Sequence, residues 1–237
     1  ETTRVENILC FEYASSLDAF EISPDGQQLA VVVNDNLYVV PMDMDRLSQV
    51  GYWDDIQAMA ACTELAPYMF SSSAPFQVKE VHWSNDLSKL AIVLPIPDVQ
   101  AGIQEDVVRI LNISQCNSYL TVLDEFPGTR FSMQGYDNNP RILHVGYDGQ
   151  VLFAVNTIDR NEGFGDLYLY NTDVYQVRPT VNPIQGHCCY RDPEFSPDGS
   201  YLVFAYQDMY LYSENKIGIY YIPDGTIGTG LTDTPFK

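Results

Sequence analysis

The sequence has few basic residues and no long apolar run. Among its 237 residues, 12 are Lys or Arg and 32 are Asp or Glu, which gives a formal net charge of −20. Nucleic acids and anionic membrane surfaces attract basic patches, so neither is expected as a partner. The best apolar run, residues 90–97, is much shorter than the ~20 residues of a membrane span and contains two prolines, so we expect no membrane insertion within this chain.

Catalytic motifs are missing as well. No Gly-x-Ser-x-Gly elbow occurs, which excludes an α/β-hydrolase catalytic domain from this chain. Paired carboxylates such as Asp43 and Asp45 are too common in so acidic a chain to indicate a glycosidase. The chain is therefore not expected to be an enzyme. Its charge suits a basic protein partner or a divalent cation, although an acidic surface also serves solubility alone.

A strand–turn–strand pattern is written twice in nearly the same residues. Residues 20–34 read FEISPDGQQLAVVVN, and residues 193–207 read PEFSPDGSYLVFAYQ. In both copies Pro presets the first central turn position, Asp suits the second, and Gly takes the left-handed conformation that returns the chain to a strand. The turn-forming residues are Ser23, Pro24, Asp25, Gly26, Ser196, Pro197, Asp198 and Gly199.

Two weaker copies lie between these. Residues 81–94 keep the serine and the aspartate but have Leu87 in place of glycine, which costs about 1 kcal/mol if the left-handed geometry is retained. Residues 143–155 keep the Asp-Gly pair but have Tyr147 in place of proline. The turns are thus centred near residues 23–26, 84–87, 146–149 and 196–199, and a further strand follows each of them.

A repeat of roughly 50 to 60 residues that contains strand, turn, strand, loop and strand is typical of a propeller blade. The fourth strand of each blade would come from the connecting segment, and the recurring turn would join the two middle strands. The predicted fold is an all-β propeller of antiparallel four-stranded blades. We expect residues 1–237 to form one domain.

The pattern of an aromatic residue, Ser-Pro-Asp-Gly, two further residues and then Leu-Ala or Leu-Val resembles the TolB-like propeller family. Its repeats also occur in the tricorn protease and prolyl oligopeptidase propellers. The resemblance covers about residues 8–225 and implies the fold, whereas propellers host many unrelated activities. That family usually builds six blades, but four copies are visible here. Either a small ring closes within this chain, or the chain is an arc of a larger propeller.

The cysteines indicate a compartment. They are Cys10, Cys62, Cys116, Cys188 and Cys189. None forms a Cys-x-x-Cys pair, so a structural zinc site has little support. A disulfide from Cys62 to Cys116 would tie both ends of the second repeat, and in a closed ring Cys10 could reach Cys188 or Cys189. We therefore expect an oxidising, extracytoplasmic location, with buried free thiols as the alternative.

The longest connection, about residues 42–78, has helical character. Apolar residues recur in it at roughly helical spacing, namely Met44, Leu47, Val50, Ile56 and Met59. We expect a short helix inserted in this inter-blade crossover, on the same face as the turns and packed on the blades. The candidate partner-binding residues are Tyr52, Trp53, Asp54 and Asp55. Alternatively, the two aromatic residues only fix the helix to its own blade.

No cofactor or metal is expected. Adjacent strand residues point to opposite faces, so at most two of residues 187–189 (His-Cys-Cys) could converge on a metal. Residues 159–166 are rich in oxygen ligands, but their glycines do not fit the helix-loop-helix calcium spacing, and a hairpin loop explains them. His82 and His144 fall within repeat strands as core or channel-lining residues. The sequon at residues 112–114 reads as an ordinary strand end outside a eukaryotic secretory context.

The predicted function is a non-catalytic extracytoplasmic propeller that acts as a protein-interaction or structural module of a larger assembly. Two alternatives stay open at this point. One is the accessory propeller of a hydrolase whose catalytic part lies elsewhere. The other is a propeller that binds a glycan or small ligand through Tyr and Trp residues of its loops.

Overall fold

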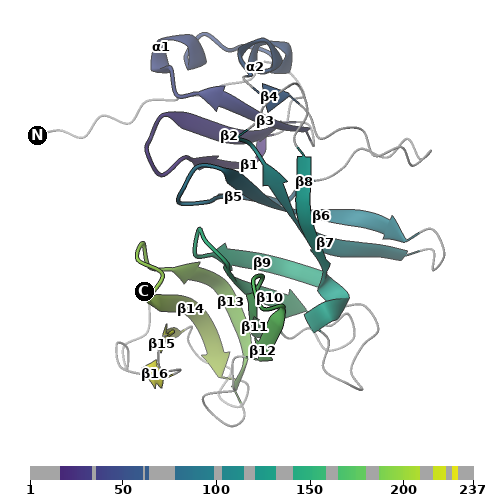
Figure 1. Cartoon of the computed structure of the whole chain (residues 1–237), viewed down its shortest axis with the longest axis vertical. Helices are drawn as coiled ribbons and strands as arrows, with labels where there is room; N and C mark the ends of the chain where they lie inside the picture. Colours follow the sequence, from purple (N-terminus) through teal and green to yellow (C-terminus); the bar gives the residue numbers. More distant parts are fainter. Residues whose placement is uncertain are drawn as a thin grey trace, which may run out of the picture. The chain divides into compact units, whose positions relative to one another are not determined.

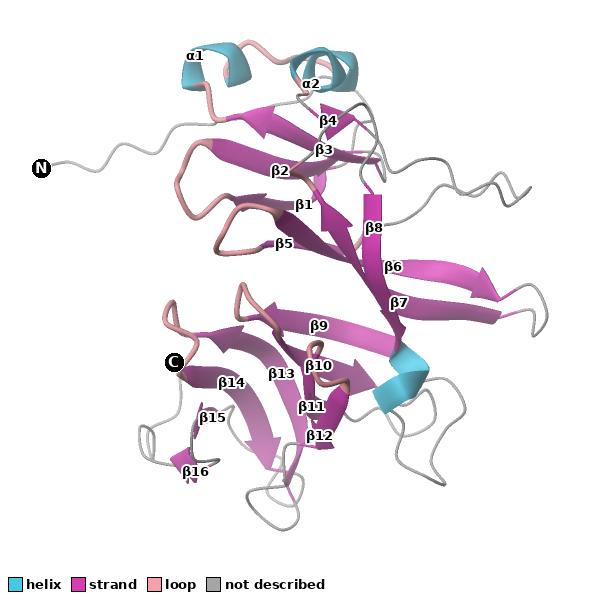
Figure 2. Cartoon of the chain, viewed as in Figure 1, coloured by secondary structure: helices cyan, strands magenta, loops and turns pink. Residues whose placement is uncertain are grey.

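In the part of the chain that it describes, a computed structural model shows mostly β-strands, with two short helices and one 3-10 turn (Figures 1 and 2). The structure describes residues 17–33, 36–60, 62–63, 78–98, 103–114, 121–131, 141–158, 165–179, 187–208, 216–222 and 226–228. Neither helix in these ranges has the length and apolar character that crossing a membrane requires.

The strands form four antiparallel sheets, each of four strands in chain order. The first sheet contains β1 (Leu17–Ile22), β2 (Gln28–Val33), β3 (Asn36–Pro41) and β4 (Cys62–Thr63). The second contains β5 (Glu80–Trp83), β6 (Lys89–Asp98), β7 (Ile103–Asn112) and β8 (Thr121–Pro127). The third contains β9 (Arg141–Tyr147), β10 (Leu152–Ile158), β11 (Gly165–Asn171) and β12 (Gln176–Pro179). The fourth contains β13 (His187–Phe195), β14 (Tyr201–Asp208), β15 (Lys216–Tyr221) and β16 (Thr226–Gly228). This order is that of up-and-down propeller blades, as the repeats predicted.

The recurring turn joins the first and second strands of each sheet, not the two middle strands. Residues 23–27 connect β1 to β2, and β3 and β4 follow on the far side of β2. In an up-and-down sheet the first and third connections emerge at one end, and the second connection and the crossover emerge at the other. The turns therefore lie at the opposite end of each sheet from the crossovers, which corrects the shared face expected from the sequence.

The helical insertion is present, but it lies inside the first sheet. Helices α1 (Met44–Leu47) and α2 (Trp53–Met59) connect β3 to β4, whereas a crossover between sheets was expected. The Met42 N–H donates to the Gln27 carbonyl at 2.8 Å, so the insertion begins beside the β1–β2 turn. The helices and that turn share an end because both belong to odd-numbered connections of one sheet.

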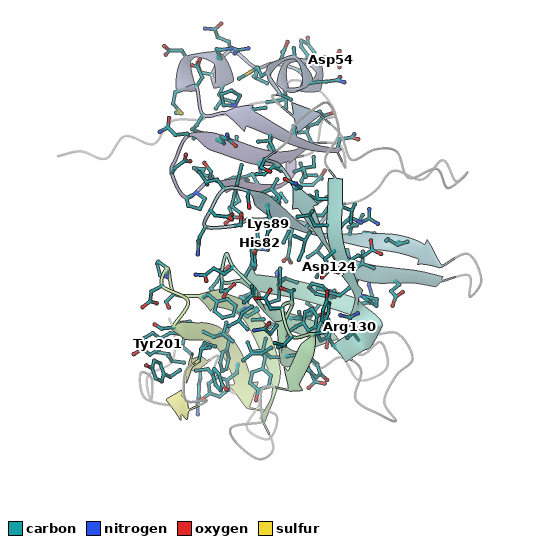
Figure 3. All side chains as sticks on the ribbon, viewed as in Figure 1. Asp54, His82, Lys89, Asp124, Arg130 and Tyr201 are labelled. Atoms are coloured by element: carbon teal, nitrogen blue, oxygen red, sulfur yellow. The ribbon has the colours of Figure 1, made fainter. Side chains whose placement is uncertain are left out.

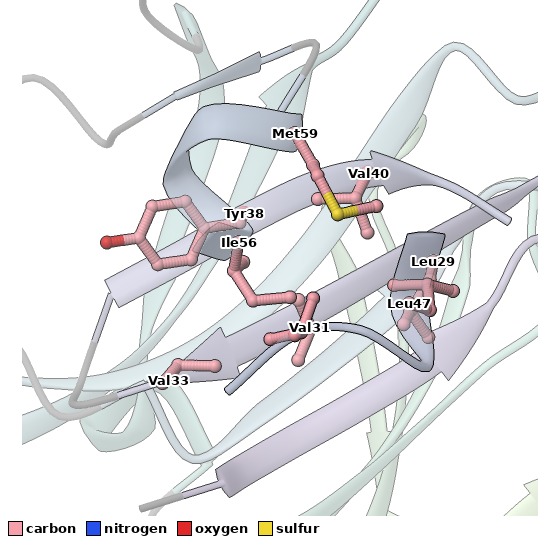
Figure 4. Close-up of a cluster of buried hydrophobic side chains, with 9 residues drawn as sticks. Leu29, Val31, Val33, Tyr38, Val40, Leu47, Ile56 and Met59 are labelled. Carbon is pink, nitrogen blue, oxygen red and sulfur yellow. The ribbon is translucent and has the colours of Figure 1, made fainter. Parts of the chain in front are cut away.

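Both helices pack on one face of β2 and β3 (Figure 4). The cluster consists of Leu29, Val31, Val33, Tyr38, Val40, Leu47, Val50, Ile56 and Met59. Ala30 and Val32, which point to the other face of β2, are buried too. Burial on both faces explains why β2 reads as a continuous apolar run rather than an alternating one. Met44, at the first position of α1, stays exposed and does not join the apolar side of the insertion.

The described residues belong to two compact units, and their boundary runs through the second sheet. The first unit covers residues 1–83, 87–94 and 109–124, and the second covers residues 84–86, 95–108 and 125–237. The first sheet and β5 therefore belong to the first unit, whereas the third and fourth sheets belong to the second. One domain over residues 1–237 stays a prediction.

In the second unit, the third and fourth sheets pack face to face. The shared cluster consists of Ala154, Leu167, Leu169, Tyr190, Leu202, Phe204 and Tyr206. The opposite face of the third sheet is covered by aromatic residues from the end of β8 and from the 3-10 turn η1 (Gly128–Phe131). Phe126 lies with its ring centroid 5.2 Å from Phe153 and 4.6 Å from Tyr170. The third sheet is thus buried on both faces.

Candidate protein-interaction site

The turn of the first repeat is held by hydrogen bonds among its own residues. Ser23 Oγ donates to Asp25 Oδ1 at 2.6 Å and accepts from the Gln28 N–H at 2.9 Å. The Gly26 N–H donates to the Ser23 carbonyl at 2.8 Å, and Gly26 has a left-handed φ of +71°. The hydrogen bond from Ser23 holds the pKa of the Asp25 carboxyl below its usual value. This carboxylate is therefore occupied in building the hairpin.

The turn of the fourth repeat is built in the same way. Ser196 Oγ donates to Asp198 Oδ1 at 2.6 Å, and Gly199 has φ of +69°. The Ser200 hydroxyl and N–H also donate to Asp198, at 2.8 and 3.1 Å. Hydrogen bonds from Ser196 and Ser200 together lower the pKa of Asp198 to about 2. This exposed carboxylate is therefore engaged in building the turn, as Asp25 is in the first repeat.

The second turn departs from this pattern because it contacts the third. The Asn85 N–H donates to the Gly149 carbonyl at 2.9 Å, and Asn85 Nδ2 donates to the Asp148 carbonyl at 2.9 Å. Asn85 stands where the first and fourth repeats have proline, which has no N–H to donate. Leu87 keeps the left-handed conformation, with φ of +61°.

The third turn departs because of the backbone of the fourth sheet. A Cβ added at Gly146 would lie 2.5 Å from the Pro193 carbonyl oxygen, so the serine of the other repeats does not fit. Asp148 Oδ1 instead accepts three backbone N–H groups of the residues that follow it. Their N···O distances are 2.8 Å for Gln150, 2.9 Å for Val151 and 2.9 Å for Leu152. The aspartates of the turns thus stabilise the hairpins even where the other residues of the motif differ.

The predicted partner surface on α2 is divided between two roles. Asp55 Oδ2 accepts the N–H groups of Tyr52 and Gly51 at 3.0 and 3.1 Å, so this residue caps the helix. Tyr52 is exposed, as is Asp54, which is labelled in Figure 3. The side chain of Trp53 lies outside the part of the chain that the structure describes.

Several other predicted residues lie outside the described part. Cys10 and Cys116 do so entirely, and so do residues 159–164 of the calcium-like run. Cys62 lies in β4, and residues 187–189 lie in β13, with the backbone alone described. No three His, Cys, Asp or Glu side chains among the described residues are grouped so that they could hold a metal ion.

The sequon and one histidine have plain local roles. Asn112 Oδ1 accepts the Ser114 N–H at 2.9 Å and the Ser114 hydroxyl at 2.6 Å, where β7 ends. His144 is about half exposed, with Nε2 3.2 Å from Asp192 Oδ1. His144 is therefore not buried in the core, because its strand position faces solvent.

β1 exposes a row of large apolar side chains that the sequence reading did not single out. The exposed fractions are 43% for Leu17, 62% for Phe20 and 44% for Ile22. We call these three residues the β1 row. Their Cα partners on β2 are Val33, Val31 and Leu29, which lie beneath α1 and α2. The β1 row thus continues the covered face of the first sheet beyond the strands that the helices cover.

The equivalent positions are buried in the second repeat. Counted from the serine that opens the turn, Phe20 corresponds to Val81 and Ile22 corresponds to Trp83, which are 4% and 3% exposed. In the fourth repeat the residue equivalent to Ile22, Phe195, packs against the cluster between the third and fourth sheets. The same position in the repeat is therefore a packing position elsewhere and an exposed apolar position in β1.

A pocket of about 290 Å³ lies beside the β1 row. Its lining residues are Leu17, Asp18, Ala19, Phe20, Lys79, Glu80, Val81 and His82. His82, labelled in Figure 3, has two carboxylate neighbours. Its Nε2 lies 3.4 Å from Glu80 Oε2, and its Nδ1 lies 3.7 Å from Glu21 Oε2. The imidazole therefore stands between two carboxylates.

Glu21 fixes β5 against β1 at this pocket. Its Oε2 accepts the Trp83 N–H at 3.0 Å, and its backbone carbonyl accepts the Trp83 indole N–H at 3.0 Å. These two bonds hold the pocket wall in place and assign Glu21 a positioning role. No sequence pattern predicts this contact between β1 and β5, because the two strands lie about 60 residues apart in the chain.

No protein-family model matches the sequence, and no curated protein matches it. Among solved structures, the chain is similar to an oligogalacturonate lyase in complex with manganese, at 15% identity and a TM-score of 0.54 over 88% of this chain and 51% of the other. The Dos1 propeller matches at 10% identity and a TM-score of 0.51, over 90% of this chain and 46% of the other. A prolyl endopeptidase matches at 14% identity and a TM-score of 0.51, over 90% of this chain and 27% of the other. The chain spans about half of these chains' length or less. The fold is a β-propeller, and its structural neighbours include both enzymes and a chain described only as a propeller.

Proposed function

We propose that this chain is a non-catalytic propeller that binds a protein partner, or forms a structural part of an extracytoplasmic assembly, through the β1 row. The observation that carries the proposal is the exposure of Leu17, Phe20 and Ile22 on one strand face. Large apolar side chains gathered on one surface are costly to leave in water, and such surfaces mark interaction sites.

Exposed apolar residues elsewhere in the described ranges are arranged differently. Val174 and Tyr175 belong to the turn between β11 and β12, where a protruding loop tip is ordinary. Val122 and Leu123 are adjacent on β8 and so point to opposite faces. Among the described residues, only those of β1 place three such side chains on the face that the core cluster uses.

Tyr52 and Asp54 on α2 form a second, smaller candidate surface. The Tyr52 side chain is exposed and sits at the start of a helix that is already anchored by Ile56 and Met59. We propose it as an accessory contact, since a tyrosine supplies contact area and a hydroxyl together.

The proposed location is extracytoplasmic, and it depends on the cysteines. Cys62 in β4 and Cys116 after β7 are the proposed bridge. Non-reducing peptide mapping of freshly purified native protein is expected to recover these two residues as one linked species. Recovery of both as free thiols would remove the support for an oxidising compartment.

The experiment for the β1 row is cross-linking mass spectrometry on native source material, comparing wild type with Phe20→Ser. The matched control is Leu123→Ser, which changes a similarly exposed apolar residue on another strand. We expect Phe20→Ser to abolish cross-links to the partner at an unchanged melting temperature, and Leu123→Ser to keep them. Partner cross-links that survive Phe20→Ser would contradict the proposal.

A further inference from the structure

We infer that the pocket beside the β1 row receives the guanidinium group of an arginine side chain from the partner. This inference rests on the proposed function, which it extends from a binding surface to the chemistry of the bound segment. The occupant is therefore a polypeptide segment whose apolar side chains cover the β1 row and whose arginine enters the pocket.

The first argument is the character of the pocket walls. Phe20, whose side chain is exposed, is one lining residue, and Leu17, Ala19 and Val81 are further apolar ones. Aromatic rings attract cations within about 6 Å of the ring centroid, and a guanidinium can also stack on the ring plane. A long side chain with an apolar stem and a planar charged end suits such a lining.

The second argument is charge. Of the lining residues, Asp18 and Glu80 are acidic, Lys79 is basic, and His82 lies with its Nε2 3.4 Å from Glu80 Oε2. Glu21 adds a further carboxylate behind His82, at 3.7 Å from its Nδ1. Since the whole chain carries a formal charge of −20, the long-range field also favours a basic partner. Carboxylates bind arginine through paired hydrogen bonds, which lysine does not offer.

The third argument is that the walls are held in place before any partner arrives. The Trp83 N–H and indole both bind Glu21, which ties β5 to β1. A wall fixed in this way loses little conformational entropy on binding. The size also agrees, because about 290 Å³ accommodates one long side chain rather than a whole ligand of drug size.

The probe is L-argininamide, with uncharged L-citrullinamide as its isostere, added to the full-length chain and followed by nuclear magnetic resonance. We expect saturable shifts at Phe20, Val81 and His82 with L-argininamide, and binding at least tenfold weaker with L-citrullinamide. Equal binding of the two probes, or no saturable shift at these residues, would overturn the inference.

Three variants locate the site. Phe20→Leu keeps an apolar side chain but removes the ring, and we expect affinity to fall about two- to fivefold. Glu80→Gln and, independently, Asp18→Asn should each weaken binding while leaving shifts at distant residues unchanged. The control is Asp54→Asn on α2, an exposed carboxylate outside the pocket. If Asp54→Asn weakens binding as much as Glu80→Gln does, the effect is general electrostatics and the inference fails.

The two proposals fail separately. If L-argininamide does not bind but Phe20→Ser still abolishes partner cross-links, the β1 row binds a partner and the pocket does not select arginine. If L-argininamide binds as expected but cross-links survive Phe20→Ser, the pocket stands as a cation site and the proposed function falls.

Discussion

The first and third repeats share one hairpin plan and differ in what touches it. Around the first turn no heavy atom lies within 4 Å of a Cβ added at Gly26, and the turn keeps the full Ser-Pro-Asp-Gly motif. Around the third turn, Gly146 abuts the Pro193 backbone, and a Cβ at Gly149 would overlap the Asn85 side chain. The serine of the motif is thus kept where the turn has room for its side chain, and glycine replaces it where the Pro193 backbone leaves none.

The first strands of the two repeats differ in the opposite way, because the first strand is covered in the third repeat and exposed in the first. β9 is covered on the face that carries Val145, whereas β1 leaves Phe20 and Ile22 exposed. Neighbouring backbone thus constrains the turn of the third repeat, whereas in the first repeat the first strand carries the exposed apolar side chains. The turn residues build the hairpin in both repeats, whereas the residues at positions such as Gly146 and Phe20 differ with what lies against each sheet.

Among changes to the turns, the largest effect is expected when the motif is restored in the third repeat. Gly146→Ser places a Cβ against the Pro193 carbonyl, which neither backbone can relieve cheaply. We expect a loss of about 3 kcal/mol in the free energy of unfolding. Urea unfolding measures it, with Ser23→Gly in the first repeat as the reverse change, which should cost about 1 kcal/mol. Equal costs for the two variants would break the comparison.

A smaller loss is expected for Asn85→Pro, which restores the motif in the second repeat. Proline removes the N–H donated to Gly149 and the side-chain bond to the Asp148 carbonyl. The loss should be about 1 to 2 kcal/mol. The matched variant Pro24→Asn, where no such acceptor is bonded, should stay within about 0.5 kcal/mol of wild type. An Asn85→Pro variant as stable as wild type would show that the contact between the turns is incidental.

Leu87→Gly should stabilise the second repeat. Leu87 holds φ of +61°, a conformation that leucine adopts at a cost and glycine adopts freely. The gain should be about 0.5 to 1 kcal/mol after the larger chain entropy of glycine is subtracted. Thermal unfolding monitors it, and Gly26→Leu should show the opposite sign. A destabilised Leu87→Gly would mean that the leucine side chain matters more than its backbone strain.

How far the fold could be predicted depends on how local its signals are. Pro24, Gly26 and their counterparts predict a turn from four consecutive residues. The helical spacing that includes Leu47 and Ile56 predicts the insertion. Which strands the turn joins is not local: β4 is only two residues long, Cys62–Thr63, and leaves no pattern. From the sequence, the recurring turn is therefore assigned to the second and third strands of each sheet, whereas it joins the first and second.

The site was harder to predict than the fold. The stretch 17–22 reads as a strand, but whether Phe20 is covered depends on helices that reach over β2 and β3 and stop there. The pocket needs β1 and β5 together, and their contact is made by Glu21 and Trp83 across the sequence. Asp55 stays a predicted binding residue, and its hydrogen bonds to the start of α2 are a capping role that the sequence analysis did not assign to it.

The smallest effect concerns acid titration. Hydrogen bonds from Ser196 and Ser200 lower the folded-state pKa of Asp198 to about 2, below the usual value of an aspartate. A depressed pKa contributes stability above the unfolded value, and this is lost as the pH falls from about 4 to about 2. Nuclear magnetic resonance titration of the carboxyl should give a midpoint near 2 in the wild type and a higher one in Ser196→Ala. An unchanged midpoint would remove the hydroxyl bond from the account.

The central claim is that the β1 row is exposed for a partner and is not part of the chain's own core. Its most direct test is the free energy of unfolding of Phe20→Ser beside Val81→Ser, the equivalent position in the second repeat. We expect Phe20→Ser to stay within about 0.5 kcal/mol of wild type and Val81→Ser to lose about 2 to 4 kcal/mol. If Phe20→Ser is destabilised as much as Val81→Ser, the chain itself covers Phe20 in solution, and the proposed binding surface does not exist.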